Sequence, residues 1–381
     1  SYRTRKKREG SEITTKESII KLSNNKTLKK YKLNSGFYAG MHLDFPGSGY
    51  IDFYKNNIII ISARGVLAFK KNIQDTGENF KQIKNNINDF IGREQFKKAN
   101  WFSLKDLLIH DNQIYVSFTE EIKENCWNTS LLKAKFDYEN IIFKKIFSPK
   151  ECVDYPNNID NEFNAHQSGG RIVAMDNKKH IIFTIGDYRS RFLAQDKQSV
   201  NGKIIKINFI DKSFQVLSMG HRNPQGLLFD SENNFILSTE HGPLGGDEIN
   251  LIKFVEKDIP NYGWPNASYG EHYGGRISLN EKKYEKYPLY KSHKDHGFIE
   301  PIKYFVPSIG ISEIVKLDKK SYVVSSLIDK SLYFFKLNKK NEITNLKRIY
   351  IHERIRDLIL KNNYLYLFLE DTASLGKIKI K

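Results

Sequence analysis

Long apolar runs and helical periodicity are both scarce in this chain of 381 residues. No apolar stretch approaches the roughly 18 residues that a membrane-spanning helix needs, so we expect a soluble chain. The chain begins at Ser1 without the apolar core of a secretory leader, from which we expect that a leader was removed or the sequence was trimmed. Only residues 79–98 carry a pattern that favours a helix, and it is weak. These absences leave strands as the main building element.

Cysteine is also scarce, since Cys126 and Cys152 are the only two. They have neither the spacing of a metal site nor a nucleophile motif beside them. The residues between them indicate two strands joined by a turn at 137–140, and a hairpin brings its two ends together. A disulfide is therefore geometrically feasible, and it would favour an oxidising compartment such as a periplasm. Two unrelated buried thiols are an equally good interpretation.

Positive charge is abundant and uneven. Residues 1–33 hold 11 Lys or Arg and 3 Asp or Glu, which accounts for +8 of the net charge of +17. We interpret residues 1–33 as a basic N-terminal tail, partly disordered or forming a closing strand, that could contact a membrane surface or another polyanion. The remaining charge suits an anionic ligand. Nucleic-acid binding is disfavoured because the chain lacks the aromatic and basic motif of a known module.

Strand-forming residues recur in a repeated unit. An apolar run, a polar turn rich in Asn, Asp and Lys, and a second β-rich run occur six times, at residues 51–65, 107–120, 171–187, 227–242, 314–329 and 357–371. One hairpin cannot bury both of its faces, but six hairpins packed around an axis can. We therefore predict an all-β, six-bladed β-propeller over residues 34–381, closed by "TLKKYKL" pairing with the final "LGKIKIK".

A long insertion at residues 254–305 interrupts the repeat. It is rich in Tyr and contains "NYGWPNASYGEHYGG", a mixture of aromatic and polar groups that suits the faces of sugars. Long loops in compact domains are more often functional than idle, although a solvent-exposed packing loop has the same composition. We expect this insertion to contribute to a binding site.

Four motifs between residues 220 and 265 resemble those of the soluble quinoprotein sugar dehydrogenases, which depend on pyrroloquinoline quinone (PQQ) and act on glucose, aldoses or sorbosone. The motifs are "GHRNPQGL", "EHGP", "GGDEIN" and "NYGWP", and weaker matches extend from about residue 100 to the C-terminus. The GGDEF signature of cyclic-dinucleotide synthases does not fit, because Ile249 follows the acids. The resemblance implies a six-bladed propeller that oxidises an aldose or related polyol by hydride transfer to PQQ, with Ca²⁺ as a second cofactor and an external electron acceptor.

The resemblance also implies a set of site residues. PQQ carries three carboxylates, which arginine binds well because its guanidinium pairs with them bidentately. Arg354 and Arg356 lie two residues apart, on one face of a strand, although they could be ordinary surface arginines. Arg222 would stabilise the developing oxyanion. The residues expected to form hydrogen bonds with the cofactor are Asn223, Gln225 and His241.

The cluster "EHGPLGGDEIN" at residues 240–250 is interpreted as the calcium site. A hard cation prefers several oxygen ligands, and a Gly-Pro turn exposes main-chain carbonyls. By resemblance, the carbonyls of Gly242 and Pro243 would hold Ca²⁺, with Asp247 and Glu248 supplying negative charge around it. The ion would polarise the quinone carbonyl as hydride arrives.

Three positions depart from the family pattern. The catalytic base of the family is a histidine four residues before the arginine of "GGR", whereas His166 stands five before Arg171 and Gln167 occupies the expected place. We still expect His166 to act as the base. A cofactor-binding lysine is replaced by Ile328, with Lys330 as a possible substitute on the same strand face. A threonine is replaced by Leu369 or Glu370, and a glutamate would repel PQQ.

These departures support an alternative function. The chain could be a catalytically degenerate propeller that binds a ligand, a glycan or a protein. We expect a periplasmic or secreted location, with membrane association through the basic tail, from the family's use of a periplasmic cofactor and from the possible disulfide.

Overall fold

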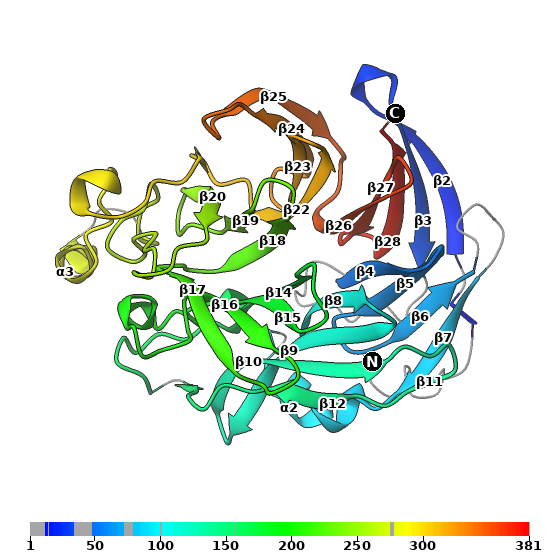
Figure 1. The fold of residues 1–381 in the computed structure, drawn as a ribbon, viewed down its shortest axis with the longest axis horizontal. Coiled ribbons are helices and arrows are strands. Elements are labelled where there is room, and N and C mark those ends of the chain that lie inside the picture. The colour runs from blue at the N-terminus through cyan, green and yellow to red at the C-terminus, as the bar shows by residue number, and fades with distance from the viewer. Residues whose placement is uncertain are drawn as a thin grey trace.

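The computed structural model describes residues 12–13, 15–33, 48–71, 79–99, 101–155, 157–274 and 278–380. The most basic part of the predicted tail, residues 1–10, lies outside these ranges. Residue 34, at which the predicted propeller domain begins, also lies outside them. The described residues form six sheets arranged as a ring around one axis (Figure 1). The chain is an all-β, six-bladed β-propeller, which confirms the predicted fold class.

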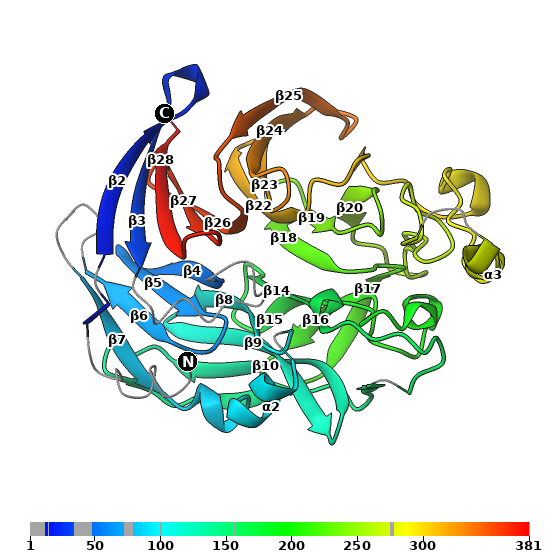
Figure 2. The same ribbon diagram turned by 180° about the vertical axis from the view of Figure 1, so that it is seen from behind.

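Each blade runs from an inner strand at the axis to an outer strand at the rim (Figures 1 and 2). Blade 1 contains β4 (Gly49–Tyr54), β5 (Asn57–Ser62), β6 (Leu67–Lys70) and β7 (Phe80–Asn85), with β1 (Glu12–Ile13) and β11 (Asn140–Ile141) paired to β7. Blade 2 contains β8 (Leu104–His110), β9 (Gln113–Lys123), β10 (Cys126–Lys135) and β12 (Lys144–Phe147), with β13 (Val153–Asp154) paired to β10. Blade 3 contains β14 (Gly169–Ala174), β15 (His180–Ile185), β16 (Lys203–Asn208) and β17 (Phe214–Met219).

The second half of the ring repeats this order. Blade 4 contains β18 (Pro224–Asp230), β19 (Phe235–Glu240), β20 (Asp247–Lys253) and β21 (Lys303–Phe305). Blade 5 contains β22 (Ile311–Asp318), β23 (Ser321–Ser326), β24 (Ser331–Leu337) and β25 (Ile343–Tyr350). Blade 6 contains β26 (Ile355–Lys361), β27 (Tyr364–Leu369), β28 (Ser374–Lys379), β3 (Thr27–Leu33) and β2 (Thr15–Lys21).

The six repeats predicted from the sequence are the two inner strands of the six blades. Their polar turns fit the tight hairpins that join these strands. In blade 2, Asp111 and Asn112 both have positive φ (49° and 59°), and they link His110 to its cross-strand partner Gln113. A two-residue turn with two positive φ angles matches the twist of the strands, and Asn and Asp tolerate that conformation. The turn residues therefore set the register of the repeat.

The ring is closed by the N-terminal strands. β3 pairs with β28 in antiparallel register, with Tyr31 opposite Leu375, and β2 lies outside β3. This is the pairing of "TLKKYKL" with "LGKIKIK" that the sequence indicated. Because β28 is covered by β3, strands from the two ends of the described chain share one sheet and the edge of β28 is not exposed.

Apolar side chains fill the spaces between neighbouring blades, because each sheet has an apolar surface on both faces. The cluster between blades 2 and 3 shows the pattern, with buried side chains from both sheets: Tyr115, Leu131, Phe147, Ile172, Ile181, Phe183, Ile185, Ile205 and Ile207. Comparable clusters lie between the other neighbouring blades. The core is thus divided among the six blade interfaces.

Buried and half-buried carboxylates join the inner strands of neighbouring blades. The side chains of Asp52, Asp106 and Asp357 accept hydrogen bonds from backbone N–H groups of the neighbouring blade, those of Ile109 (2.6 Å), Ile172 (2.8 Å) and Ile51 (2.8 Å), respectively. In the same way, Glu313 of blade 5 accepts from Leu227 N of blade 4 (3.0 Å). Each bond satisfies a backbone donor across a blade interface.

Arg171 is the central cation of this arrangement and is 1% exposed. Its Nη1 lies 2.7 Å from Asp357, 3.1 Å from Glu313 and 3.2 Å from Asp106. Its remaining nitrogens donate to the carbonyls of Gln225 and Arg356, both at 2.7 Å. The arginine of the "SGGRI" motif therefore connects inner strands from five blades. It compensates carboxylates that would otherwise be buried without a cation.

Helices are few among the described residues. The predicted helix at 79–98 is wrong for its first half, because residues 80–85 form the outer strand β7 and the only α-helix within this range is α2 (Arg93–Lys98). The long insertion contains a second helix, α3 (Ser278–Lys286), which lies at the rim beside blade 4 (Figure 1). Neither described helix has the length and apolar character required to cross a bilayer.

Short 3₁₀ turns make up the rest of the helical structure in the described part of the chain, at Ser23–Asn25, Ile87–Asp89, Ala165–Gln167, Arg191–Gln195 and Lys294–His296. The two cysteines are joined by a disulfide, with Cα atoms of Cys126 and Cys152 separated by 5.3 Å. This decides between the two interpretations of the cysteine pair in favour of the bridge. It links the start of β10 to the segment before β13.

Candidate active site

A cavity of about 350 Å³ lies where the inner ends of the six blades meet. Every blade, or the loop that leads into it, contributes at least one side chain to the wall. The lining residues are Tyr50, Lys105, His166, Asn223, Gln225, His241, Gly310, Leu327, Ile328, Arg354, Arg356 and Glu370. Six of the residues expected at the cofactor and catalytic site are among them, although they come from motifs far apart in the sequence. We call this space the axial cavity.

β-Bulges at the start of the inner strands explain which side chains enter the axial cavity. The pairing register shifts across Lys105 in blade 2, Gln225 in blade 4 and Arg356 in blade 6. A bulge inserts an extra residue into one strand and re-aims its side chain. The three residues occupy the same structural position in three blades, and all three line the cavity.

Glu370 lies between the two arginines predicted to bind the cofactor. Its carboxylate accepts from Arg356 Nε at 2.6 Å and Nη2 at 3.3 Å, from Arg354 Nε at 3.2 Å and from Ser48 Oγ at 2.9 Å. Burial alone would raise the pKa of Glu370, but the two guanidiniums outweigh burial and hold that pKa at about 2. Glu370 is thus ionised and already pairs with both arginines. Leu369, the other position considered for the missing threonine, is fully buried in the core.

Lys105 is a further cation in the cavity wall and is 4% exposed. Its Nζ donates to the carbonyls of Trp101 and Ala165, both at 3.3 Å. Burial, with help from the charge of Arg356, lowers the pKa of Lys105 to about 7. Gly170 leaves room for its stem, because a Cβ at Gly170 would lie 2.4 Å from the Cβ of Lys105 and φ there is +109°. The glycines of "SGGRI" are therefore required by packing.

His166 lines the axial cavity despite the extra residue between it and Arg171. The strand that follows begins with a bulge between Gly169 and Ile172. His166 lies in the 3₁₀ turn at Ala165–Gln167, which is capped because Asn164 Oδ1 accepts from His166 N at 2.8 Å. The imidazole ring lies 5.8 Å from the ring of Trp101. The structure thus brings His166 to the predicted site.

Gln167 points instead into a buried polar group beside the cavity. When its amide nitrogen faces Asp187, it donates to Oδ1 at 2.9 Å, and its oxygen accepts from Arg222 Nη2 at 3.0 Å. Asp187 also accepts from the indole nitrogen of Trp264 at 2.8 Å. Burial raises the pKa of Asp187 to about 6, and the charge of Arg222 opposes this rise. Gln167 therefore links the aspartate to the arginine.

Arg222 is held close to the cavity by several contacts. Its Nη1 donates to the carbonyl of His241 at 3.3 Å, and its guanidinium lies 5.3 Å from the ring centre of Trp264. Its buried Nε has no hydrogen-bond partner among the described residues. His241 lines the cavity itself, and burial, followed by the charges of Arg222 and Arg356, lowers its pKa. His241 is therefore neutral at physiological pH.

The loop predicted to hold calcium follows His241 directly. Asp247 is buried and accepts four hydrogen bonds at 2.9–3.1 Å, from the backbone N–H groups of Gly242, Ile309 and Ile311 and from Ser308 Oγ. Asp247 therefore fixes the turn and leaves little capacity for a metal. No described residue donates a hydrogen bond to the carbonyls of Gly242 or Pro243.

Glu248 points away from this turn. It accepts from the amide of Asn250 at 3.1 Å, and burial raises its pKa well above the ordinary value for glutamate. The proposed substitute lysine is also turned away, since Lys330 Nζ pairs with Asp371 at 2.9 Å and is not part of the cavity wall. Ile328 reaches the cavity, but its side chain is 65% exposed at the mouth.

The sequence profile of the glucose/sorbosone dehydrogenase family matches residues 104–378, which is more than half of the chain. The chain belongs to this family. The match begins at β8 and includes blades 2 to 5 and the C-terminal strands of blade 6, together with all the cavity residues except Tyr50.

Curated relatives of the dehydrogenase family share moderate identity with the chain. The aldose sugar dehydrogenase YliI of Escherichia coli (strain K12) is 28% identical over 228 residues, which are 54% of this chain and 57% of that protein. Quinoprotein glucose dehydrogenase B of Acinetobacter calcoaceticus is 35% identical over 134 residues, 27% of this chain and 26% of that protein. The matched region therefore spans little more than half of the first relative and about a quarter of the second.

Solved structures support the propeller fold. A glucose dehydrogenase crystal structure superposes with a TM-score of 0.66 at 23% identity, covering 86% of this chain and 95% of that one. The PQQ-bound aldose sugar dehydrogenase of Streptomyces coelicolor gives a TM-score of 0.65 at 17% identity, covering 93% and 98%. At these identities the similarity establishes the architecture only.

Several residues of this family member's site were missed in the sequence. Lys105 and Tyr50 were not considered, and Asp187 and Trp264 lie in matched motifs without an assigned role. One signal was available for Lys105. The segment "SLKDLLI" at residues 103–109 has the same pattern as "RIRDLIL" at 354–360, so that Lys105 corresponds to Arg356. Comparing the repeats with one another would have identified this cation.

Proposed function

We propose that this protein is a PQQ- and Ca²⁺-dependent sugar dehydrogenase, which oxidises an aldose or a related polyol and passes the electrons to an external acceptor. One observation carries the proposal. Six residues expected from separate motifs, namely His166, Asn223, Gln225, His241, Arg354 and Arg356, line a single cavity on the propeller axis. The names of the relatives, which include an aldose sugar dehydrogenase and a quinoprotein, agree with this chemistry.

The groups in the cavity wall fit a planar anionic cofactor. Arg354 and Arg356 are cationic donors, Lys105 with its pKa of about 7 is partly charged at neutral pH, and the amides of Asn223 and Gln225 offer neutral donors. The single carboxylate of Glu370 leaves a surplus of positive charge. A cofactor carboxylate would therefore share the two guanidiniums with Glu370, because each guanidinium has donors beyond those used in the ion pair. In this proposal PQQ binds, and competition from Glu370 for the two guanidiniums lowers its affinity.

The calcium ligands would be the carbonyls of Gly242 and Pro243. The four hydrogen bonds to Asp247 hold this turn in place, so the two carbonyls are preorganised at the end of the segment that begins in the cavity at His241. Oxygen ligands of this kind suit a hard cation. Asp247 contributes negative charge near the ion while its oxygens remain engaged with the backbone.

When bound, PQQ would accept a hydride from the sugar, with Ca²⁺ polarising the quinone carbonyl. His166 accepts the proton of the sugar hydroxyl at its imidazole nitrogen, since it is the cavity-lining residue best suited to act as a base near neutral pH. Arg222 places positive charge beside the reacting oxygens, and its orientation is fixed by Gln167, Asp187 and Trp264. Asn223 and Gln225 position the bound ring.

The test is reconstitution of the purified protein with PQQ and CaCl₂. We expect a shift in the PQQ absorbance spectrum and reduction of a redox dye when an aldose is added. If the protein shows no spectral shift and no dye reduction with any of several aldoses, the proposal is contradicted.

Replacing the base separates binding from chemistry. His166→Asn should leave the spectral shift intact and slow dye reduction by about 10²- to 10⁴-fold, the usual contribution of a general base. His180→Asn, at the hairpin turn that begins β15 and not part of the cavity wall, is the matched control and should retain full activity. Equal activity of the two variants would rule out His166 as the base.

Glu370 is the specific observation that favours a second candidate, a propeller that has lost the chemistry and binds a ligand, glycan or protein. If the Glu370 ion pair excludes PQQ, the cavity can accept only less acidic ligands. Reconstitution that fails while glycan binding is retained would support this candidate over the first.

We also propose a periplasmic or secreted location, supported by the disulfide between Cys126 and Cys152, because such bonds persist in oxidising compartments. Membrane-surface contact through the basic tail remains part of this proposal. Fractionation of cells that express the natural gene tests both statements.

A further inference from the structure

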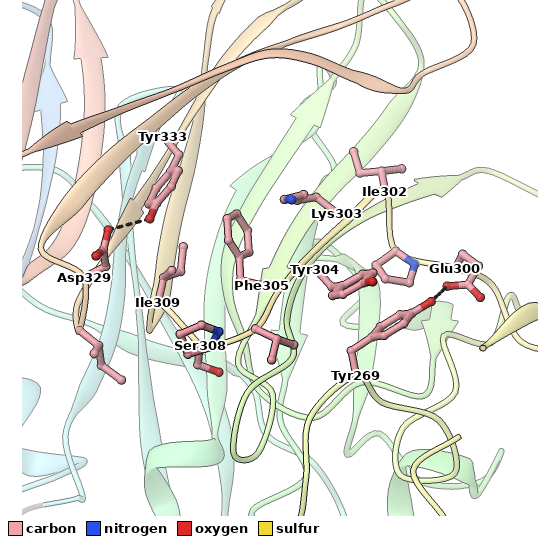
Figure 3. Close-up of a pocket in the computed structure, with 14 residues that line it drawn as sticks. Tyr269, Glu300, Ile302, Lys303, Tyr304, Phe305, Ser308, Ile309, Asp329 and Tyr333 are labelled. Atoms are coloured by element: carbon pink, nitrogen blue, oxygen red, sulfur yellow. Dashed lines mark hydrogen bonds between the residues drawn. The ribbon is translucent and has the colours of Figure 1, made fainter. Parts of the chain in front are cut away.

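A second hollow, which we call the outer groove, opens beside the axial cavity. It has a volume of about 1030 Å³ and is shown in Figure 3. Its wall comprises Tyr269, Glu300, Pro301, Ile302, Lys303, Tyr304, Phe305, Val306, Pro307, Ser308, Ile309, Ile328, Asp329 and Tyr333. Most of these residues come from the end of the long insertion, from β21 and from the loop before β22.

The outer groove adjoins the axial cavity. Ile328 lines both spaces, and its side chain is 65% exposed. The adjacent residues Ile309 and Gly310 are divided between the two walls, with Ile309 in the groove and Gly310 in the cavity. A ligand too long for the axial cavity can therefore extend past Ile328 into the groove.

A pair of stacked tyrosines provides a flat platform in the groove. The rings of Tyr269 and Tyr304 lie 3.6 Å apart and within 3° of parallel (Figure 3). Tyr269 is fixed by a hydrogen bond from its hydroxyl to Glu300 at 2.7 Å and by the ring of His293 at 5.3 Å. Tyr304 is 44% exposed, so the stack presents a rigid aromatic surface to the groove. Such preorganised rings bind the apolar faces of ligands at little entropic cost.

The charges of the groove balance one another. Asp329 accepts from Arg348 Nε at 2.7 Å and Nη2 at 3.0 Å, and from the hydroxyl of Tyr333 at 2.6 Å. The other carboxylate, Glu300, shares the wall with Lys303. A ligand that carries a net charge would gain nothing from this wall, whereas a ligand with many hydroxyls finds acceptors and donors beside an aromatic platform.

We propose that the outer groove is a subsite for the outer units of a neutral oligosaccharide whose terminal aldose lies in the axial cavity. Tyr304 stacks on a sugar ring, and Ile328 marks the boundary between the terminal unit and the next one. This inference rests on the proposed function, because it specifies that the proposed sugar dehydrogenase prefers oligosaccharides as substrates. The long insertion then has the sugar-binding role that its composition suggested.

The experiment compares glucose with the neutral trisaccharides maltotriose and cellotriose. In the binding arm, calorimetry on the protein without added PQQ should show affinity for at least one trisaccharide that exceeds the affinity for glucose. Tyr304→Ala should weaken trisaccharide binding about tenfold through loss of the aromatic contact. Tyr350→Ala is the matched control, because Tyr350 is 41% exposed on β25 and is not part of the groove.

In the kinetic arm, Tyr304→Ala in the reconstituted protein should raise KM for the trisaccharide about tenfold, with kcat and the KM for glucose unchanged. Val306→Trp is a second variant that fills the groove from its exposed wall without removing the stack, and it should have the same effect. Thermal unfolding of each variant verifies that the fold is retained.

The two proposals fail in different ways. Dye reduction with glucose but no trisaccharide affinity, or equal losses for glucose and trisaccharide in Tyr304→Ala, would overturn the subsite and leave the dehydrogenase. Trisaccharide binding that depends on Tyr304 without any dye reduction would support the groove as a glycan site and overturn the dehydrogenase.

Discussion

Replacing Glu370 tests whether the chain's own carboxylate competes with a cofactor for the arginines of the axial cavity. In Glu370→Gln the side-chain volume is retained and the negative charge is removed. Arg354 and Arg356 lose their ionic partner and become available to an anionic ligand. We expect PQQ to bind about tenfold more tightly, because one charge-assisted pairing becomes available to it.

The same substitution should lower stability, and the magnitude follows from the ion pair. The guanidiniums hold the pKa of Glu370 at about 2, below its ordinary value of 4.5. That difference corresponds to about 3 kcal/mol of folding free energy at neutral pH. Breaking a buried ion pair by removing one partner costs a similar amount, about 3–5 kcal/mol. Glu370→Gln should therefore be about 3 kcal/mol less stable than the unmodified protein at pH 7.

The effect has a defined pH dependence. Because the pKa of Glu370 is depressed in the folded state, its stabilisation is present above pH 4.5 and is lost as pH falls from 4.5 towards 2. The difference in unfolding free energy between the two proteins should thus shrink from about 3 kcal/mol at pH 7 to near zero at pH 2. Urea unfolding of both proteins across this range measures the difference.

Glu353→Gln serves as the control for both effects. Glu353 is also buried in blade 6, where it accepts from Thr372 and pairs with Lys30, but it is not part of the cavity wall. It should lose stability without any gain in PQQ affinity. If Glu370→Gln binds PQQ no more tightly than the unmodified protein and is equally stable, the reasoning about the cavity charges is refuted.

Two further predictions concern the stability of the ring. Arg171→Leu should destabilise the protein by about 3–5 kcal/mol in urea unfolding, because Asp106, Glu313 and Asp357 lose their shared cation, and a variant as stable as the parent would contradict the central role of Arg171. The double variant Cys126→Ala and Cys152→Ala should lose about 3 kcal/mol, the entropic value for a bridge that spans 26 residues, and dithiothreitol should have no effect on its unfolding although it destabilises the parent.

The fold could be predicted because each repeat carries its own turn chemistry. Asp111 and Asn112, or Asn362 and Asn363, adopt positive φ at little cost, so each hairpin is specified locally before any long-range contact forms. The helix at 79–98 could not be delimited in this way. In residues 80–85 only Phe80 and Ile83 are buried, a spacing of three that does not mark a strand, and the strand forms because β7 pairs with β6, which is a tertiary effect. Helix α3 is mostly polar and gives little amphipathic signal.

The site was predictable as a set of residues but not as a set of contacts. The motifs identified His166, Gln225, His241 and Arg356, and the ring geometry brings them to one cavity. Their partners depend on side-chain directions that the sequence does not reveal. Whether Glu370 faces the arginines or the core is decided by the pairing of β27 with β26, since Glu370 directly follows the last residue of β27.

The inner-strand bulges connect the stability of the ring to the charge of the cavity. In blades 2 and 6 the bulge residue, Lys105 or Arg356, enters the cavity, and the aspartate that follows it accepts from the backbone of the next blade. Both aspartates also pair with Arg171. A substitution that straightened either bulge would therefore withdraw a cation from the cavity and break an inter-blade hydrogen bond at once. For this reason the charge of the cavity is best altered by a substitution that keeps both bulges. Glu370→Gln does so, because it removes the anionic partner of Arg354 and Arg356 and leaves both arginines in place.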